Sequence, residues 1–351
     1  MKTITVCVSK QYDVIIGRSL ICQIGSYATS VHSPCKAVIV SDSNVWPLYG
    51  ESVSHSLKNA GFESEPFVFP AGEDSKNTDT YFQLLNFLAE HQLTRSDLII
   101  ALGGGVVGDL AGFTAATFLR GIRYIQVPTT LLAMVDSSVG GKTAVDLPVG
   151  KNLVGAFYQP SLVLCDIDAL STLPEQIFRD GCAEVIKYGI LYDDGLFAHL
   201  NEYGIKFDKE SVIARCVELK RDVVMEDEFD TGARQKLNFG HTIGHGVEAN
   251  SSFTISHGQA VAIGMAIVSR ASLVNALCNS QCCQQILTVL DRFQLPVHTE
   301  YTAEELFHSA LSDKKRSGNR VNLIVPKDIG NCAIWPINVS EIKSFIEAGL
   351  K

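Results

Sequence analysis

The chain has 351 residues, of which 46% are hydrophobic and 19% charged, and its formal net charge is −9 at pH 7. This composition is typical of a globular protein with a substantial core, and the length allows about two domains. The acidic balance argues against a nucleic-acid or anionic-membrane surface, because both need a basic face. We therefore expect a small-molecule substrate, with no nucleic-acid or membrane partner.

The N-terminal segment, residues 1–17, alternates apolar and polar residues as a strand does and has no signal-peptide pattern. No apolar run in the chain approaches the ~20 residues of a membrane span. We expect a cytoplasmic protein. The ten cysteines contain no C-x-x-C pair, so we interpret them as reduced thiols of the core.

Short apolar runs alternate with helical segments through the first half of the chain. Strands are predicted at 35–45, 62–73, 96–105, 122–130 and 161–167, with a helix at 79–92 between two of them. This alternation predicts an α/β domain with a parallel, Rossmann-like sheet. We place it at residues 1–172.

The character of the sequence changes after Leu173-Pro174. Segments 175–191, 209–228 and 257–277 carry apolar residues at the 3.6-residue period of amphipathic helices, with few strand signals. We therefore expect residues 173–351 to form a mostly α-helical second domain.

A glycine-rich stretch, "ALGGGVVGDLAGF", gives Gly103, Gly105 and Gly108 the spacing G-x-G-x-x-G between a predicted strand and a helix. Backbone amides at such a turn can approach a pyrophosphate at the positive end of the helix. The usual fingerprint also has an acidic residue about 20 positions later, and none lies between Leu110 and Val135. A dinucleotide site and a simple tight turn both remain open on this motif alone.

Polar residues at the ends of other predicted strands offer further ligand contacts. They are Asp42, Asn44, Glu73 and Lys76, on the rim where open sheets bind ligands. The stretch "DSSVGGKT" ends like a phosphate-binding loop, but Asp136 stands where that motif needs glycine. What remains are Lys142, Lys151 and Asn152 near glycine turns, which suit an anionic or polyhydroxylated ligand unless they are ordinary surface residues.

Metal-ligand candidates lie in the helical half. His241 and His245 are four residues apart, hence on one helix face, and His257 opens a later apolar helix. Thr242 replaces the glutamate of the zinc-protease motif H-E-x-x-H. Upstream, Glu184 and Lys187 share a face of an apolar segment. Three histidines and a carboxylate predict a metal site, but the spacing does not decide which side chains coordinate.

Six stretches, in this order, resemble the 3-dehydroquinate synthase family of the sugar phosphate cyclases. They are "GGGVVGDLAGFTAATFLRGI", "VPTTLLAMVDSSVGGKTAVD", "GKNLVGAFYQP", "AEVIKYGIL", "LNFGHTIGHGVEA" and "HGQAVAIGM". The resemblance extends from the first strand to "DKKR" at 313–316, so it covers nearly the whole chain. It implies a glycine loop that holds NAD, in a sheet that differs from the standard Rossmann arrangement.

The resemblance also implies a lyase of the shikimate pathway, which leads to chorismate and the aromatic amino acids. Such an enzyme converts 3-deoxy-D-arabino-heptulosonate 7-phosphate to 3-dehydroquinate and phosphate. NAD transiently oxidises the substrate, phosphate is eliminated, the hydride is returned, and an intramolecular aldol step closes the ring. A divalent metal, zinc or alternatively cobalt, and a homodimer are implied as well.

Site residues follow from the resemblance, position by position. Glu184, His241 and His257 match the metal ligands, which moves His245 to the substrate side. Matches to phosphate contacts are Lys142, Asn152, Asn238, His245 and Lys314; Lys220 and Arg234 match carboxylate contacts, and Asp136, Lys151 and Lys187 lie near the hydroxyls. Arg120 matches an arginine supplied by the neighbouring subunit. Matches to the nucleotide site are Asp42, Asn44, Glu73, Lys76, Gly105, Asp109, Thr129, Thr130, Lys142, Lys151, Thr172 and Leu173.

One stretch departs from the family pattern. Where the family usually has "DEREGGLR" this chain has "DEFDTGAR", so Phe229 replaces an arginine and Asp230 a glutamate. Other interpretations are a cyclase acting on a different heptulose phosphate, a metal-dependent polyol dehydrogenase and a non-catalytic NAD sensor. The sensor would be marked by loss of the metal ligands, and all three are present.

Overall fold

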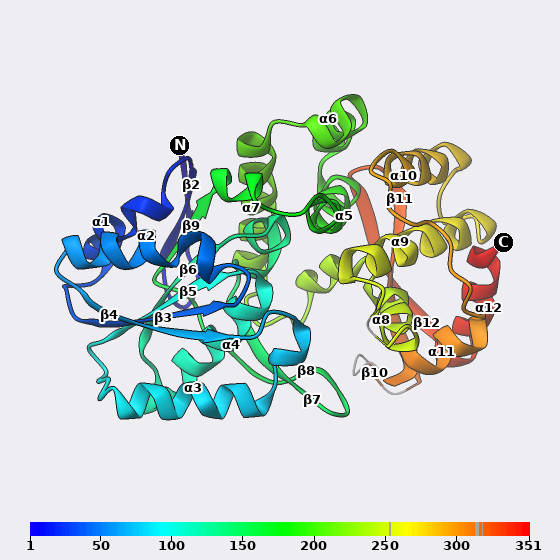
Figure 1. Ribbon diagram of the computed structural model, residues 1–351. Helices are drawn as coiled ribbons and strands as arrows, with labels where there is room; N and C mark the ends of the chain where they lie inside the picture. The colour runs from blue at the N-terminus through cyan, green and yellow to red at the C-terminus, as the bar shows by residue number, and fades with distance from the viewer. Residues whose placement is uncertain (253, 313–315, 318) are drawn as a thin grey trace. The chain divides into compact units, whose positions relative to one another are not determined.

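The computed structural model describes residues 1–252, 254–312, 316–317 and 319–351. These form two compact units (Figure 1): residues 1–174 with 209–229, and residues 175–208 with 230–351. Lys314, a predicted phosphate contact, lies outside the described residues.

The first unit contains a seven-stranded sheet in the order β1-β2-β9-β6-β5-β3-β4. Its strands are β1 (Lys2–Val6), β2 (Tyr12–Gly17), β3 (Lys36–Asp42), β4 (Glu63–Phe69), β5 (Leu98–Gly103), β6 (Arg123–Pro128) and β9 (Leu162–Asp166). Only the pairing of β1 with β2 is antiparallel. The predicted α/β fold with a parallel sheet is confirmed, and the N-terminal strand is a two-strand hairpin at its edge.

Helices cover both faces of this sheet, α1 and α2 on one and α3 and α4 on the other (Figure 1). Their bounds are α1 (Ile24–Val31), α2 (Trp46–Asn59), α3 (Thr78–Glu90) and α4 (Gly105–Thr117). Every residue of β5 and β9 is buried. This explains the continuous apolar runs in the sequence, because a strand of a parallel sheet is covered on both sides.

Two elements beyond the sheet were not anticipated from the sequence. A π-helical turn, η4 (Ala133–Ser137), follows β6, and β7 (Lys142–Leu147) pairs with β8 (Gly150–Phe157) as a separate antiparallel hairpin. The sequence analysis read this region only as glycine-rich turns. One of these glycines is required by the hairpin itself. Gly155 of β8 lies so close to β7 that a Cβ there would be 2.2 Å from the carbonyl oxygen of Thr143.

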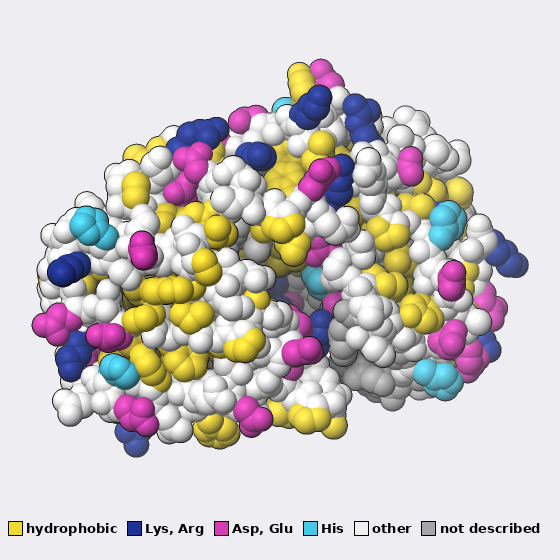
Figure 2. Space-filling view, in the orientation of Figure 1, with side chains coloured by type: hydrophobic (Ala, Val, Ile, Leu, Met, Phe, Trp, Pro, Cys, Tyr) yellow, Lys and Arg dark blue, Asp and Glu magenta, His cyan; other side chains and the backbone are white. Residues whose placement is uncertain are grey.

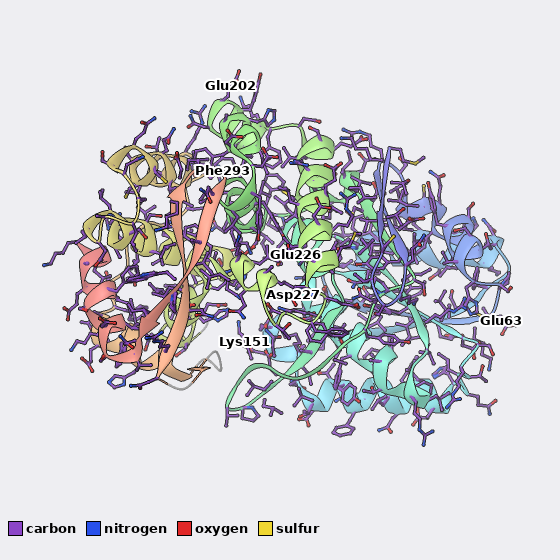
Figure 3. The ribbon with its side chains drawn as sticks, turned by 180° about the vertical axis from the view of Figure 1, so that it is seen from behind. Glu63, Lys151, Glu202, Glu226, Asp227 and Phe293 are labelled. Carbon is purple, nitrogen blue, oxygen red and sulfur yellow. The ribbon has the colours of Figure 1, made fainter. Side chains whose placement is uncertain are left out.

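Helix α7 (Lys209–Glu226) belongs to the first unit, which differs from the single boundary expected at residue 172. It packs on β1, β2 and η4 through a buried apolar face that includes Ile213, Val217 and Val224. Figure 3 shows the helix beside the sheet, with Glu226 and Asp227 at its C-terminal end. Apolar periodicity predicted the helix and its buried face, but periodicity carries no information about which unit that face packs against.

The second unit is mostly helical, as expected. Its helices are α5 (Glu175–Tyr192), α6 (Asp194–Tyr203), α8 (His241–Asn250), α9 (His257–Val274), α10 (Ser280–Arg292), α11 (Ala303–Ser312) and α12 (Val339–Leu350). A small antiparallel sheet of β10 (Arg316–Ser317), β11 (Arg320–Asp328) and β12 (Asn331–Asn338) adds to them. The sequence analysis did not predict this sheet.

The buried helix α9 lies in direct backbone contact with its neighbours. A Cβ on Gly258 would lie 2.0 Å from the carbonyl oxygen of Asp180 in α5, and one on Gly264 would lie 2.0 Å from that of Gly240. Gly240 itself precedes α8 in the left-handed conformation, with φ of +80°. Helices α5, α8 and α9 therefore meet at positions where only glycine fits.

Charged side chains of both signs are spread over the face shown in Figure 2, and apolar side chains gather on part of the first unit. The first unit exposes several large apolar residues, among them Leu48, Val68 and Phe82. Of the ten cysteines, all with free thiols, six are buried, but Cys7 and Cys22 are exposed and so are not core residues. No helix in the described part of the chain has the length and hydropathy to cross a membrane.

We expect Gly240→Ala to destabilise the protein more than Gly330→Ala, measured by urea unfolding. Both glycines have nearly the same positive φ, +80° and +78°, so the strain of about 1–3 kcal/mol is common to both. A Cβ at position 240 would also lie 2.7 Å from the carbonyl oxygen of Val261, whereas one at 330 meets nothing nearer than 3.1 Å. The overlap should cost about 1–3 kcal/mol more, and equal losses would contradict this account of the α8–α9 contact.

Candidate functional site

In the first unit, the glycine loop joins β5 to α4. Gly104 is the N-cap residue of α4 and brings no side chain over the first amides of the helix. A Cβ there would lie 3.1 Å from Cγ2 of Thr130, and one on Gly105 would lie 3.2 Å from Oγ of Ser137. The loop therefore leaves backbone N–H groups open at the positive end of a helix, which suits a pyrophosphate.

The predicted nucleotide contacts follow the carboxyl ends of the parallel strands. Asp42 is the last residue of β3 and Asn44 follows it, Glu73 follows β4, Thr129 and Thr130 follow β6, and Thr172 and Leu173 come after β9. Carboxyl ends of parallel strands meet at one edge of a sheet, the edge at which open α/β sheets bind ligands. The structure thus places these residues along the same edge, as a dinucleotide site requires.

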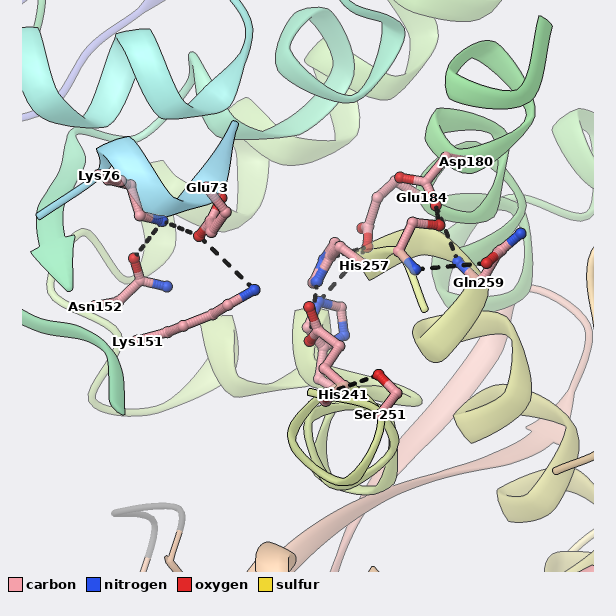
Figure 4. Close-up of polar contacts among 12 residues, drawn as sticks. Glu73, Lys76, Lys151, Asn152, Asp180, Glu184, His241, Ser251, His257 and Gln259 are labelled. Carbon is pink, nitrogen blue, oxygen red and sulfur yellow. Dashed lines mark hydrogen bonds and ion pairs between the residues drawn. The ribbon is translucent and has the colours of Figure 1, made fainter. Parts of the chain in front are cut away.

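A buried lysine organises the charge at this edge. Lys76 Nζ lies 2.7 Å from Glu73 Oε1, 3.6 Å from Asp109 Oδ2 and 3.7 Å from Asp146 Oδ1. The same ammonium donates to Asn152 Oδ1 at 3.0 Å, and Lys151 Nζ lies 3.7 Å from Glu73 Oε1 (Figure 4). Five residues predicted separately from the sequence, Glu73, Lys76, Asp109, Lys151 and Asn152, therefore form one cluster.

The cluster contains three carboxylates and two ammonium groups, and the pKa of Asp109 is raised. Burial raises the pKa of Asp109 to about 7; Glu73 and Asp146 act in the same direction, and Lys76 opposes them. The ammonium of Lys76 is held charged, since the same three carboxylates raise its pKa although burial lowers it. The Asp109 carboxyl therefore titrates near neutral pH.

Other predicted residues of the first unit lie outside this cluster. Lys220 Nζ donates to Asp136 Oδ1 at 2.6 Å and to its carbonyl oxygen, which joins α7 to the π-helical turn. Thr172 Oγ1 lies 2.5 Å from the hydroxyl of Tyr49. Lys142 is exposed at the start of β7. Arg120 is exposed as well, with a positive φ of +67°.

In the second unit, Glu184, His241 and His257 converge (Figure 4). Nε2 of His241 lies 3.5 Å from Glu184 Oε1, and Nε2 of His257 lies 3.6 Å from the same oxygen. All three ligand atoms lie within 4.8 Å of one another. Two ligands of a tetrahedral zinc at ~2.0–2.1 Å stand about 3.4 Å apart. The two distances to Glu184 Oε1 are close to that spacing, so these side chains could hold one divalent cation.

In both histidines, a protein oxygen contacts Nδ1, the ring nitrogen that does not face Glu184. Nδ1 of His241 lies 3.1 Å from the carbonyl oxygen of Phe239, and Nδ1 of His257 lies 3.4 Å from Glu248 Oε2. With a metal at Nε2, Nδ1–H can donate to these oxygens, and such contacts fix the orientation of each ring. Although burial lowers the pKa of His257, Glu184 and Glu248 raise it to about 10. The same carboxylate field favours a cation at this position.

The donor set fits catalytic zinc or cobalt. One carboxylate and two imidazoles are three protein ligands, which leaves positions for substrate oxygens. A second group of three, His245, Glu248 and His257, shares His257 with the first. The pair His241 and His245, favoured by helix spacing alone, have ring centroids 5.5 Å apart. Each group contains one buried carboxylate, Glu184 in the first and Glu248 in the second. Glu184 is fully buried and also pairs with Lys187.

The remaining predicted residues of this unit lie near these elements. Lys187 forms an ion pair with Glu184 Oε2, His245 is one helical turn after His241, and Arg234 is a buried residue of the short helix before α8. Asn238 Nδ2 donates to the carbonyl oxygen of Gln235 at 3.0 Å. The structure thus brings the metal candidates together with Lys187 and His245.

Comparison with known proteins gives the family. Family profiles described as 3-dehydroquinate synthase N-terminal and C-terminal match residues 66–180 and 181–316. A 3-dehydroquinate synthase of Streptococcus suis is 44% identical over 343 residues, 96% of this chain and 97% of its own length. One from Enterococcus faecalis is 44% identical over 352 residues, 99% of this chain and 98% of its own length.

The chain belongs to the 3-dehydroquinate synthase family. The family predicted from the sequence is therefore confirmed. A solved 2-deoxy-scyllo-inosose synthase, complexed with carbaglucose-6-phosphate, NAD+ and Co2+, is similar at 25% identity with a TM-score of 0.90, covering 99% of this chain and 100% of its own. A 2-epi-5-epi-valiolone synthase of Streptomyces hygroscopicus with NAD+ and Zn2+ is 26% identical with a TM-score of 0.89, covering 99% and 98%.

Three polar residues of this family member were missed by the sequence analysis. Glu248 contacts His257, Asp146 joins the Lys76 cluster and accepts from Asn152 N at 2.6 Å, and Asp180 contacts the start of α9. Glu248 follows His245 by three residues, so helix spacing could have flagged it. Asp180 had no such signal, because its partners Ser256 and Gln259 are distant in the sequence. Asp146 lies six residues before Asn152 across an unpredicted hairpin, and its other partner, Lys76, is distant.

We expect Glu184→Gln to weaken zinc binding at least about 100-fold, measured by competition with a chromogenic chelator, because it removes a charged ligand. Glu175→Gln is the matched control, since Glu175 opens the same helix and pairs with Arg179 at the surface. It should bind zinc like the wild type. Equal affinity of Glu184→Gln and the wild type would rule out this metal position.

Asp109→Asn tests the proton held by the Lys76 cluster. An unfolded chain releases this proton near the ordinary pKa of 3.8, whereas burial raises the pKa in the folded chain to about 7. The folded state then binds more protons between those values, so its stability falls as pH rises through that interval. In urea titrations, wild-type stability relative to Asp109→Asn should fall from about pH 4 to about pH 7. A relative rise would mean that Asp109 is ionised throughout.

Proposed function

We propose that this chain catalyses the 3-dehydroquinate synthase reaction. It converts 3-deoxy-D-arabino-heptulosonate 7-phosphate to 3-dehydroquinate and inorganic phosphate, using NAD and a divalent metal, zinc or cobalt. The observation that carries the proposal is the convergence of His241 Nε2 and His257 Nε2 on one oxygen of Glu184, at 3.5 and 3.6 Å, in a chain of this family. The glycine loop at the start of α4 supports the nucleotide.

The substrate's chemistry explains why both groups are needed. A phosphate on carbon is eliminated readily only when a neighbouring carbonyl acidifies the proton that must leave. A bound NAD would accept the hydride from carbon C5 as the C5 hydroxyl becomes a carbonyl and would later return it, and a bound metal would polarise substrate oxygens. The protein's task is then to hold the substrate in one orientation and to exclude competing reactions.

We assign roles to individual residues on the basis of the family resemblance. In the first unit, Lys142 and Asn152 are phosphate contacts, Asp136 and Lys151 lie near hydroxyls, and Lys220 faces the carboxylate; the contact of Lys220 with Asp136 supports a shared task. In the second unit, His245 and Asn238 are phosphate contacts, Arg234 faces the carboxylate, and Lys187 lies near the hydroxyls. The leaving phosphate accepts the C6 proton itself, so the reaction needs no separate strong base.

The domain and subunit organisation proposed here follows the same resemblance. The nucleotide-binding residues belong to the first unit, and the metal ligands to the second. We propose a cytoplasmic homodimer in which Arg120 serves the neighbouring subunit. Arg120 is exposed, and Leu119 and Arg120 both have positive φ. Such backbone strain at non-glycine residues supports a functional role.

The deciding experiment is phosphate release from the heptulosonate phosphate with catalytic amounts of NAD. We expect phosphate release with 3-dehydroquinate as the product. A chelator should abolish this turnover, because it removes the metal that Glu184, His241 and His257 would hold against the substrate. NAD binding should survive chelation, since the nucleotide residues lie in the other unit. Zinc should restore turnover. Oxidation of glycerol instead would favour a polyol dehydrogenase, and irreversible unfolding on chelation would make the metal structural.

A further inference from the structure

Asp180 lies in α5 one helical turn before Glu184, and its side chain contacts a different helix. Oδ1 of Asp180 accepts a hydrogen bond from Gln259 N at 3.0 Å and another from Oγ of Ser256. The backbone N–H of Gly258 donates to the same carboxylate. Three donors from the start of α9 therefore converge on one side chain of α5; Figure 4 shows Asp180 beside Gln259.

His257 lies between these donors in the sequence. It stands between Ser256 and Gly258 and is the first residue of α9. Glu184, four residues after Asp180, lies on the same face of α5 as Asp180. One carboxylate thus connects the two chain segments that supply Glu184 and His257 to the metal position.

The backbones at this point are as close as their atoms allow. A Cβ on Gly258 would lie 2.0 Å from the carbonyl oxygen of Asp180 and 2.8 Å from its Oδ1. The hydrogen bonds of Asp180 therefore act where α5 and α9 are already in contact, which leaves little freedom for His257 to shift relative to Glu184.

Ordinary helix capping does not account for these contacts. Helix α9 has its own capping box of Ser256 and Gln259, and the backbone N–H of Gln259 is shared between this box and Asp180 Oδ1. Asp193 shows the ordinary case: it caps α6, the helix that follows it directly, by accepting from Leu196 N at 2.8 Å. Asp180 adds a bond from a separate helix to a terminus that is already capped.

We propose that Asp180 is a positioning residue of the metal centre, which holds the first turn of α9 so that His257 Nε2 stays at metal-ligand distance from Glu184. The proposal rests on the proposed function in one respect, that Glu184, His241 and His257 bind the metal. The role is argued from the hydrogen bonds that Asp180 accepts from the start of α9; His257 also acts on the Asp180 carboxylate through its charge, and the variants below separate the two effects.

Three variants of the full-length protein separate these possibilities, with Zn2+ affinity measured by chelator competition and Co2+ coordination by visible absorption. Asp180→Ala should weaken Zn2+ binding about 10–100-fold, the usual effect of losing a group that orients a ligand, and should alter the Co2+ spectrum. Asp180→Asn should retain most of the affinity, because its Oδ1 still accepts from Ser256 and Gln259. Asp193→Ala, the matched control, should lower the melting temperature and leave Zn2+ affinity unchanged.

Each alternative result overturns the proposal. Equal loss in Asp180→Asn and Asp180→Ala would mean that charge acts on the cation directly. Loss in Asp193→Ala as large as in Asp180→Ala would mean that general destabilisation is responsible. If Asp180→Ala does not fold, Ser256→Ala, which removes one donor, should give a smaller loss of affinity; wild-type affinity there would contradict the role. Failure of the metal assignment itself is distinct, since Glu184→Gln would then bind Zn2+ normally.

Discussion

The close backbone contact of α9 with α5 and with the start of α8 is the constraint on which the metal centre depends. At Gly258 and Gly264 the neighbouring carbonyl oxygens stand 2.0 Å from where a Cβ would be. A side chain at Gly258 would push α9 away from α5, which carries Glu184, and one at Gly264 would push α9 away from the start of α8, which carries His241. Metal ligands need placement to within a few tenths of an ångström, and helix contacts without intervening side chains provide such rigidity.

The charges of both units follow a common rule, that a buried charge is paired or hydrogen bonded. In the second unit, Glu184 is fully buried among Lys187 and two histidines. In the first, buried Lys76 contacts Glu73, Asp109 and Asp146. The two sites attract ligands of opposite charge. The histidine site attracts a cation, whereas the positive end of α4 near the glycine loop attracts an anion. This division matches a metal on one unit and a pyrophosphate on the other.

Helix α7 shows how the chain crosses between its units more than once. It leaves the second unit at Asp208, runs along β1 and β2, and returns after Phe229. The departure from the family pattern falls at this return. Phe229 packs edge to face on Phe157 of β8, with ring centroids 5.4 Å apart, so the residue that replaces the family's arginine has an apolar contact of its own within the first unit.

The sequence by itself determined the parallel sheet, the helical second half and the glycine loop, because each is encoded by local periodicity or by a contiguous motif. It also supplied His241, His245, His257 and Glu184 as metal candidates, but helix spacing favoured the pair His241 and His245. The resemblance to the family selected Glu184, His241 and His257 instead, and the tertiary structure shows that these residues, which come from helices far apart in the chain, converge. The return of α7, the β7–β8 hairpin and the sheet of β10, β11 and β12 were decided in three dimensions. So were the contacts of Asp146 and Asp180, because the partner of a polar side chain is set by packing and leaves no local pattern.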